Sequence, residues 1–446
     1  MTAPTKPRGF TEEAINELIA QRNEPAWMTE RRRTAWTAWN DLPMPDPRKD
    51  EEWRRTPLRL LELDEATPLS DAAKANVVPL APAGELAAAL TFVDGQVTAR
   101  QDIADDLRQQ GVIVTDLRSA LAEHADLVQR YFMTVVKPTE AKFAALHGAF
   151  WDNGVFVYVP KGVAVALPVG VVVESAAPGR ASLHHTLIVM ERDSSLKYVE
   201  ELRGGVAATA DGQAFSSRVI ELVQGDGTTL DFATIQRFSP AMFDFYDARV
   251  VQARDTNFTL HNIELGAAMS KGHIEALLEG AGAHARLAGI YFADHDQHLD
   301  RYTLQDHKGI NTTSDLLFKG VVADTARSVY SGYIRIHPGA KGSRAYQQNR
   351  NIQLSRKARA DSNPSLEIAE NDILGCTHGA TVGKVDEEQL FYLMCRGLSR
   401  GEATQMIVEG FLDQLVEAIP LPTLRVSLRD ELIARVEATT VETDAA

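Results

Sequence analysis

The sequence contains very little cysteine, with only Cys376 and Cys395 among its 446 residues. Two thiols cannot cross-link a chain of this length, which argues against a secreted disulfide framework and predicts a reducing, cytoplasmic location. Long apolar runs are missing as well, and no segment reaches the roughly 18 residues that a membrane-spanning helix needs. Residues 1–10 lack the apolar stretch and the cleavage site of a secretory signal, so we expect no export.

Positive charge is in the minority, because 46 Lys and Arg face 61 Asp and Glu and leave a net charge of −15. An acidic surface disfavours binding to nucleic acid and to anionic membranes. The sequence has no G-x-x-x-x-G-K-[ST] phosphate loop, and Gly280-Ala281-Gly282 lacks the third glycine of a dinucleotide fingerprint. Neither G-x-S-x-G nor H-E-x-x-H occurs. We therefore expect a chain that binds no nucleotide, neither ATP nor NAD, through these known motifs.

What is present falls into three regions. Residues 1–145 carry helix-start signals and an Ala- and Pro-rich linker over 62–90, and they predict a mainly helical domain. Residues 146–385 consist of short β-branched runs separated by Gly, Asp and Asn, which predict strands. Residues 386–446 return to helical periodicity. A doubly wound α/β fold is disfavoured, because it needs a helix between successive strands.

The strand-rich region has a loose internal repeat. Segments 324–327, 339–342 and 356–359 each precede an alternating run, and they recur at about 15–18 residues. This spacing suits a stacked β-solenoid that exposes small or charged residues at its corners. A sandwich or a jelly roll gives similar strand spacing, so the repeat leaves these folds open.

The C-terminal region has clear helix boundaries. Asp386 predicts the start of a helix that ends at Gly397, since glycine suits a left-handed C-terminal cap. Ser399 and Glu402 have the spacing of a capping box before a second helix. A short third helix is expected over 427–437.

The short element Cys376-Thr377-His378-Gly379 carries the most suggestive chemistry. Residues two apart in an extended segment share a face, so the thiol and the imidazole can point to the same side. Together they suit a soft or borderline metal such as iron or zinc. Two ligands are too few for an iron–sulfur cluster, which takes about four. The others would have to come from elsewhere, with a dimer interface as the natural source; a structural turn is the alternative interpretation.

Two other groups of residues contain potential ligands. His295 and His298, with Asp300 and His307 nearby, form an H-x-x-H pattern that can bind zinc or iron. Residues three apart in a strand face opposite ways, however, so polar contacts along a sheet are the alternative. Cys395 lies among apolar neighbours and is expected to be a buried, inert thiol.

Several stretches of the chain form a recognisable series. The C-terminal signature covers residues 372–383, 386–393 and 396–398, and weaker matches lie at 52–56, 312–320, 345–351 and 365–368. In this order they resemble the SufB/SufD family of iron–sulfur cluster assembly scaffold proteins over nearly the whole chain. The B-type member usually reads His-Glu-Ala-Thr where this chain has His378-Gly379-Ala380-Thr381. The difference favours a D-type member.

The resemblance implies a mainly β fold with α-helical ends, built as a right-handed parallel β-helix (β-solenoid) core between N- and C-terminal helical domains. It implies a complex with a SufB-type subunit and with SufC, a separate ABC-type ATPase, and leaves a homodimer of the isolated chain open. A transient iron–sulfur cluster would be shared at the subunit interface, where His378 matches the family histidine and Cys376 its neighbour. SufC would dock on residues 386–419, through Leu390, Phe391, Arg396, Gly397, Met406 and Phe411.

Two rival functions remain open. A B-type scaffold would hold the nascent cluster itself, and the low cysteine count argues against it. A β-helix hydrolase acting on polysaccharide would gather carboxylates on one exposed strand face, and the sequence shows no such grouping.

Overall fold

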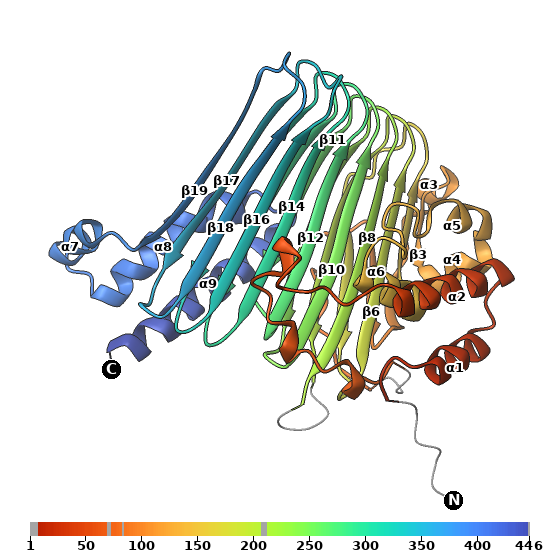
Figure 1. Cartoon of the computed structure of the whole chain (residues 1–446), viewed down its shortest axis with the longest axis horizontal. Helices are drawn as coiled ribbons and strands as arrows, with labels where there is room; N and C mark the ends of the chain where they lie inside the picture. The colour runs from red at the N-terminus through yellow and green to blue at the C-terminus, as the bar shows by residue number, and fades with distance from the viewer. Residues whose placement is uncertain (1–7, 69–72, 83, 207–211, 445–446) are drawn as a thin grey trace, which may run out of the picture.

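Two sheets of mainly parallel strands dominate the molecule and run along its length (Figure 1). The structure is a computed structural model that describes residues 8–68, 73–82, 84–206 and 212–444. From β4 (Asn153–Val159) onward the chain alternates between the sheets, so consecutive strands belong to opposite sheets. We call these the odd sheet and the even sheet, after the numbers of most of their strands.

Each sheet starts, at the C-terminal end of the solenoid, with one of the last two strands of the chain. In order from that end, the odd sheet contains β19 (Gly375–Lys384), β17 (Arg344–Gln353), β15 (Thr313–Val322), β13 (His284–Ala293), β11 (Asn257–Glu264), β9 (Thr229–Phe238), β7 (Ser195–Gly204), β5 (Val169–Ser175), β1 (Ala88–Val93) and β2 (Gln96–Gln101). The even sheet contains β18 (Arg359–Ile368), β16 (Arg327–Ile336), β14 (His298–His307), β12 (Met269–Leu278), β10 (Met242–Gln252), β8 (Ala214–Gln224), β6 (Ala181–Met190), β4 (Asn153–Val159) and β3 (Ile113–Asp116).

Each coil of the solenoid contributes one strand to each sheet, and successive coils stack in register. Arg327 of β16 pairs with His298 of β14 on one side and with Arg359 of β18 on the other. The repeated corner segments separate consecutive strands, so the sequence repeat is half a coil. Corners need left-handed backbone, which Asp324 adopts at φ 50° and Gly342 at φ 68°. The expected β-solenoid with helical ends is confirmed.

The space between the sheets becomes more polar toward the C-terminal end. Apolar side chains such as Leu230, Phe232 and Leu260 fill the earlier coils. Further along, the Tyr291 hydroxyl donates to Asn351, and the amide of Asn349 donates back to Tyr291. These hydrogen bonds satisfy buried polar groups, which would lower the stability of the fold if they were left without partners.

The N-terminal region combines helices with strands. Its helices are α1 (Glu12–Arg22), α2 (Ala26–Asp41), η1 (Glu51–Trp53), η2 (Leu58–Leu60), η3 (Leu63–Glu65), α3 (Asp105–Gln109), α4 (Leu117–Glu123), α5 (Ala125–Tyr131) and α6 (Lys142–Phe150). Strands β1 to β3 also lie before residue 146, so the sheets begin earlier than the sequence suggested. β1 pairs in parallel with β5, and such pairing stabilises a strand that local composition does not reveal.

The expected linker over residues 62–90 is partly packed against the solenoid. Leu80 and Leu86 are buried in a cluster with Val172 and Val199 of the odd sheet. Residues 69–72 and 83 lie outside the described residues.

Three helices follow the solenoid: α7 (Glu387–Cys395), α8 (Arg400–Glu417) and α9 (Pro422–Asp444). The predicted signals at their starts are confirmed, because Asp386 caps α7 and Ser399 forms a capping box with Glu402. The last helix is longer than expected and begins at Pro422, since proline is tolerated in a first helical turn. In the described part of the chain, no helix is long and apolar enough to cross a membrane.

Candidate functional site

The C-terminal end of the solenoid is open. β18 and β19 are the terminal strands of the two sheets, and among the described strands each pairs on one side alone. An edge strand presents unpaired backbone groups that can pair with another chain. Apolar side chains are exposed at this end, and Leu374, in the corner between the two strands, is 74% exposed.

β19 places Cys376 and His378 on the inner face of the odd sheet, at this open end. They pair with Ala345 and Gln347 of β17, whose buried side chains point between the sheets. Cys376 is half-buried and packs beside Ile334, Ile336 and Ala345. His378 is exposed, because no further coil covers it. The Cα atoms of the two residues are roughly 7 Å apart, the repeat of an extended strand.

The two side chains form an incomplete metal site. Burial raises the pKa of the Cys376 thiol and favours its neutral form, which is not the form that binds a metal. Among the described residues, no group of three or more His, Cys, Asp or Glu side chains is arranged to hold a metal ion. The sequence prediction of a Cys and His pair on one face of an extended segment is thus confirmed, and the remaining ligands are not found in the described chain.

The second histidine group does not assemble. His295 sits at a corner with its side chain 74% exposed and paired with Asp294. His298 is buried, and burial lowers its pKa to about 4. Asp300 binds Lys271, while His307 contacts the hydroxyls of Thr312 and Ser314. The alternative interpretation, separate polar contacts along the sheets, is the one that the structure supports.

Cys395 was expected to be buried, and this prediction was wrong. It lies exposed at the C-terminal end of α7. Three apolar neighbours on α7 are exposed as well: Phe391, Tyr392 and Met394. The helix projects beyond the sheets instead of packing on them, which the local sequence does not reveal (Figure 1).

The six expected docking residues separate into two groups. Phe391 is 70% exposed, Met406 is half exposed, and Arg396 and Gly397 lie on the surface between α7 and α8. Gly397 takes the left-handed conformation predicted for it, at φ 98°. Leu390 is instead buried, and Phe411 packs against the outer face of the odd sheet. Phe411 therefore helps to hold α8 against the sheet.

α8 and α9 cover the outer face of the odd sheet. Val408, Leu412 and Leu415 of α8 pack with Ile290 of β13 and Val321 of β15. The buried strand residues of this apolar cluster lie on β5 to β15, and Tyr346 of β17 is exposed.

A buried lysine joins α8 to the sheet. Lys319 of β15 is 7% exposed and donates to the carbonyl of Phe411 at 2.7 Å, with its ammonium over the Phe411 ring. Burial and the charge of Arg350 lower the Lys319 pKa. Lys319, Arg350 and Thr381 are aligned across β15, β17 and β19. The row connects α8 to the strand that carries His378.

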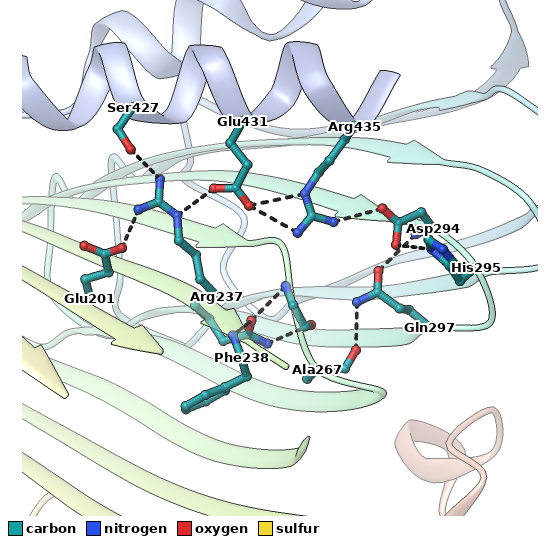
Figure 2. A network of polar contacts seen from close by, with 12 residues as sticks. Glu201, Arg237, Phe238, Ala267, Asp294, His295, Gln297, Ser427, Glu431 and Arg435 are labelled. Carbon is teal, nitrogen blue, oxygen red and sulfur yellow. Dashed lines mark hydrogen bonds and ion pairs between the residues drawn. The ribbon is translucent and has the colours of Figure 1, made fainter. Parts of the chain in front are cut away.

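A polar network holds α9 to the same face (Figure 2). Arg237 of β9 contacts Glu431 of α9 at 2.7 Å, Ser427 of α9 at 3.3 Å and Glu201 of β7. Arg435 of α9 contacts Asp294 at 2.9 Å. Sequence reasoning missed the residues of this network and Lys319, because their partners are remote in sequence and no short motif links them.

Comparison with known proteins gives a consistent result over most of the chain. Residues 12–171 match the SufBD protein N-terminal region, and residues 172–411 match the SufBD core domain of SUF system FeS cluster assembly. The chain belongs to the SufBD family. It is 32% identical to the iron–sulfur cluster assembly protein SufD of Bacillus subtilis, over 96% of this chain and 98% of that protein.

Other relatives match almost equally well. The SufB protein of Bacillus subtilis is 28% identical over 93% of this chain and 90% of its own length. A SufBD family protein of Staphylococcus saprophyticus is 29% identical over the same shares. These similarities place the chain in the family but do not separate a B-type from a D-type member.

Proposed function

We propose that this chain is a SufD-type subunit that supports iron–sulfur cluster assembly without being an enzyme itself. Its cluster is cargo, built transiently at an interface with a SufB-type subunit. One observation supports this proposal above all: Cys376 and His378 lie at the unpaired end of the solenoid without further ligands in the described chain. A partner at that end would both cover the edge strands and supply the missing ligands.

The open end has the properties of a protein interface. β18 and β19 offer unpaired backbone groups to added strands. Exposed apolar side chains line the same end, and contiguous exposed apolar surface is typical of interaction sites. They are Leu366, Ile368, Leu374 and Val382. A partner strand on β19 would bring its own side chains beside His378.

The energy for assembly would come from a SufC-type ATPase bound to α7 and the start of α8. The exposed Phe391, Tyr392, Met394 and Met406 supply apolar contacts of the kind that dominate docking energetics. Movement of α8 would reach β19 through Lys319 and the adjoining strands. For this to work, the interface must have two arrangements, and the nucleotide-bound ATPase must stabilise one of them more than the other.

The docking claim is tested by substitution on the exposed surface. Phe391→Asp combined with Met406→Asp should abolish co-purification of a SufC-type ATPase, because both changes place charge in an apolar contact. Val426→Asp is the matched control, since Val426 is equally apolar, exposed and located on α9. Retention of the ATPase by the double variant would refute docking at this surface.

A SufB-type scaffold is the second candidate, because the chain matches SufB of Bacillus subtilis nearly as well as SufD. Anaerobic reconstitution of the isolated chain separates the two. A SufD-type subunit should hold no stable cluster alone, whereas a SufB-type scaffold should do so.

A further inference from the structure

One polar side chain interrupts an apolar column inside the solenoid. On the inner face of the odd sheet, side chains of successive strands stand in register, because each strand pairs in parallel with the next. From β9 to β15 this column is buried and apolar, and its members are Phe232, Leu260, Leu287 and Leu316. The next two members are Gln347 of β17 and His378 of β19. The column therefore becomes polar at the position directly beside His378.

Glutamine is an unfavourable choice for packing alone at this position. The Gln347 side chain is wholly buried, and burial of an amide destabilises a fold unless hydrogen bonds satisfy it. Leucine, which the column has on β11, β13 and β15, would pack there without that cost. The amide at residue 347 therefore indicates a need for a polar group next to the open end.

The fold holds this amide in one orientation. Nε2 of Gln347 donates to the carbonyl of Gly332 on β16 at 3.2 Å. A Cβ atom added to Gly332 would lie 2.6 Å from the same nitrogen, so glycine leaves the room that the amide needs. Because Nε2 is bonded on that side, Oε1 is the free acceptor, and this buried oxygen has no hydrogen-bond partner among the described residues.

The side chain that can satisfy this oxygen is His378. Because Oε1 is buried, bulk solvent does not reach it, and its partner is to be sought among the adjacent side chains. Of its two neighbours in the column, Leu316 has no donor, whereas His378 has a ring N–H. Neighbouring strands are roughly 4.8 Å apart, a spacing that an amide and an imidazole on one face can bridge by side-chain rotation. His378 makes no hydrogen bond, ion pair or ring contact within the part of the chain that the structure describes, so its ring is free to turn.

We propose that Gln347 is a positioning residue for His378. This inference rests on the proposed function, in which His378 is a ligand of the cluster built at the interface. When a partner covers the open end, the imidazole turns inward and one ring N–H donates to Oε1 of Gln347. The other ring nitrogen then faces the interface with its lone pair available. A hydrogen bond from the second nitrogen of a histidine ligand fixes both the tautomer and the orientation of the ring.

Substitution of residue 347 in the reconstituted complex tests the proposal. The complex contains the full chain, a SufB-type subunit and a SufC-type ATPase, and loading with iron and sulfide is followed by visible absorbance. Gln347→Leu continues the leucine column and removes the acceptor, so it should leave the unfolding temperature and the assembly unchanged but slow loading roughly 10–100-fold. Gln347→Glu keeps an acceptor oxygen and should retain most of the loading rate. Gln348→Leu is the matched control, because it makes the same change at the adjacent residue, which faces away from the interior, and should leave the rate unchanged.

A spectroscopic measurement separates positioning from a purely structural role. With ¹⁵N-histidine in this chain alone, pulsed EPR of the reduced cluster detects a ring nitrogen that is bound to iron. The native complex should show a single ¹⁵N coupling. The cluster that forms in Gln347→Leu should show more than one, because either ring nitrogen can bind once the tautomer is no longer fixed.

The outcomes distinguish this inference from the proposed function. Loss of loading in His378→Ala, with normal loading and an unchanged ¹⁵N coupling in Gln347→Leu, would refute the positioning role and leave the proposed function intact. Normal loading of His378→Ala would refute both. If Gln347→Leu does not assemble, Gln347→Met removes the acceptor from a side chain of similar length and carries the same prediction. Loss of loading in Gln347→Glu would also overturn the positioning role.

Discussion

Arg237 offers the sharpest test of how the C-terminal helices are held to the solenoid. Arg237→Met keeps the aliphatic stem and removes the guanidinium that bridges Glu201, Ser427 and Glu431 (Figure 2). Glu201 keeps its contact with Arg203, and Glu431 keeps Arg435, so neither carboxylate is left buried and unpaired. The substitution therefore removes only the contacts that Arg237 makes, which we call the Arg237 tether, and adds no penalty from an unpaired buried carboxylate.

The magnitude follows from the contacts. The contact of Arg237 with Ser427 is a hydrogen bond from a charged donor, a class that contributes roughly 1.5–3 kcal/mol, and its contact with Glu431 is an ion pair, which contributes roughly 0–1 kcal/mol when exposed. The Arg237 side chain is 16% exposed and that of Glu431 26%, so we discount the two contacts with α9 to about 2 kcal/mol in total. A loss of about 2 kcal/mol makes the local opening of α9 away from the odd sheet about 30 times more favourable.

Hydrogen exchange of α9 amides, read by mass spectrometry under native conditions, measures this opening. We expect exchange of peptides from α9 to be about 30 times faster in Arg237→Met. Arg254→Met is the matched control, because its pair with Asp226 at 3.2 Å is largely exposed and exposed pairs contribute roughly 0–1 kcal/mol. Identical exchange of α9 in the Arg237 variant and the native chain would refute the tether.

Two further predictions concern titratable groups. Burial lowers the His307 pKa from 6.5 to about 4, so the unfolded chain takes up a proton first and stability falls as the pH drops from about 6.5 toward 4. At pH 5 this lowers the free energy of unfolding by roughly 2 kcal/mol. His307→Gln should remove that part of the pH dependence of amide protection in β14. An unchanged pH dependence would contradict the assignment of this effect to His307. Burial raises the Cys376 pKa, so iodoacetamide at pH 7.5 should label the exposed Cys395 several-fold faster, as read by peptide mass spectrometry. Equal labelling rates would show that Cys376 is not shielded.

Local signals in the sequence predicted local structure well. The side chains of Asp386 and Ser399 cap α7 and α8 as expected, because a helix cap is set by residues within one turn. The recurring corner segments suited a stacked β-solenoid but left a sandwich or a jelly roll open, and the resemblance to the SufB/SufD family decided between them. The spacing of Cys376 and His378 showed that they could share a face of an extended segment, but the sequence left a structural turn open, and the pairing of β19 with β17 decides for the strand.

Features set by remote contacts could not be read in this way. β1 depends on pairing with β5, and the Arg237 contact with Ser427 joins residues 190 positions apart. The exposure of Cys395 depends on where α7 projects, not on its apolar neighbours. Tertiary context decides such cases, and a single sequence carries no direct signal of it.

The central claim is that the Cys376 and His378 pair completes a cluster site only with a partner. The decisive measurement is anaerobic iron and sulfide loading, read by visible absorbance and bound iron, for the chain alone and with a SufB-type subunit and SufC-type ATPase. We predict no stable cluster on the isolated chain, a cluster in the complex, and loss of that cluster with His378→Ala while the complex stays assembled. A stable cluster on the isolated chain, or normal loading of the His378→Ala complex, would contradict the account.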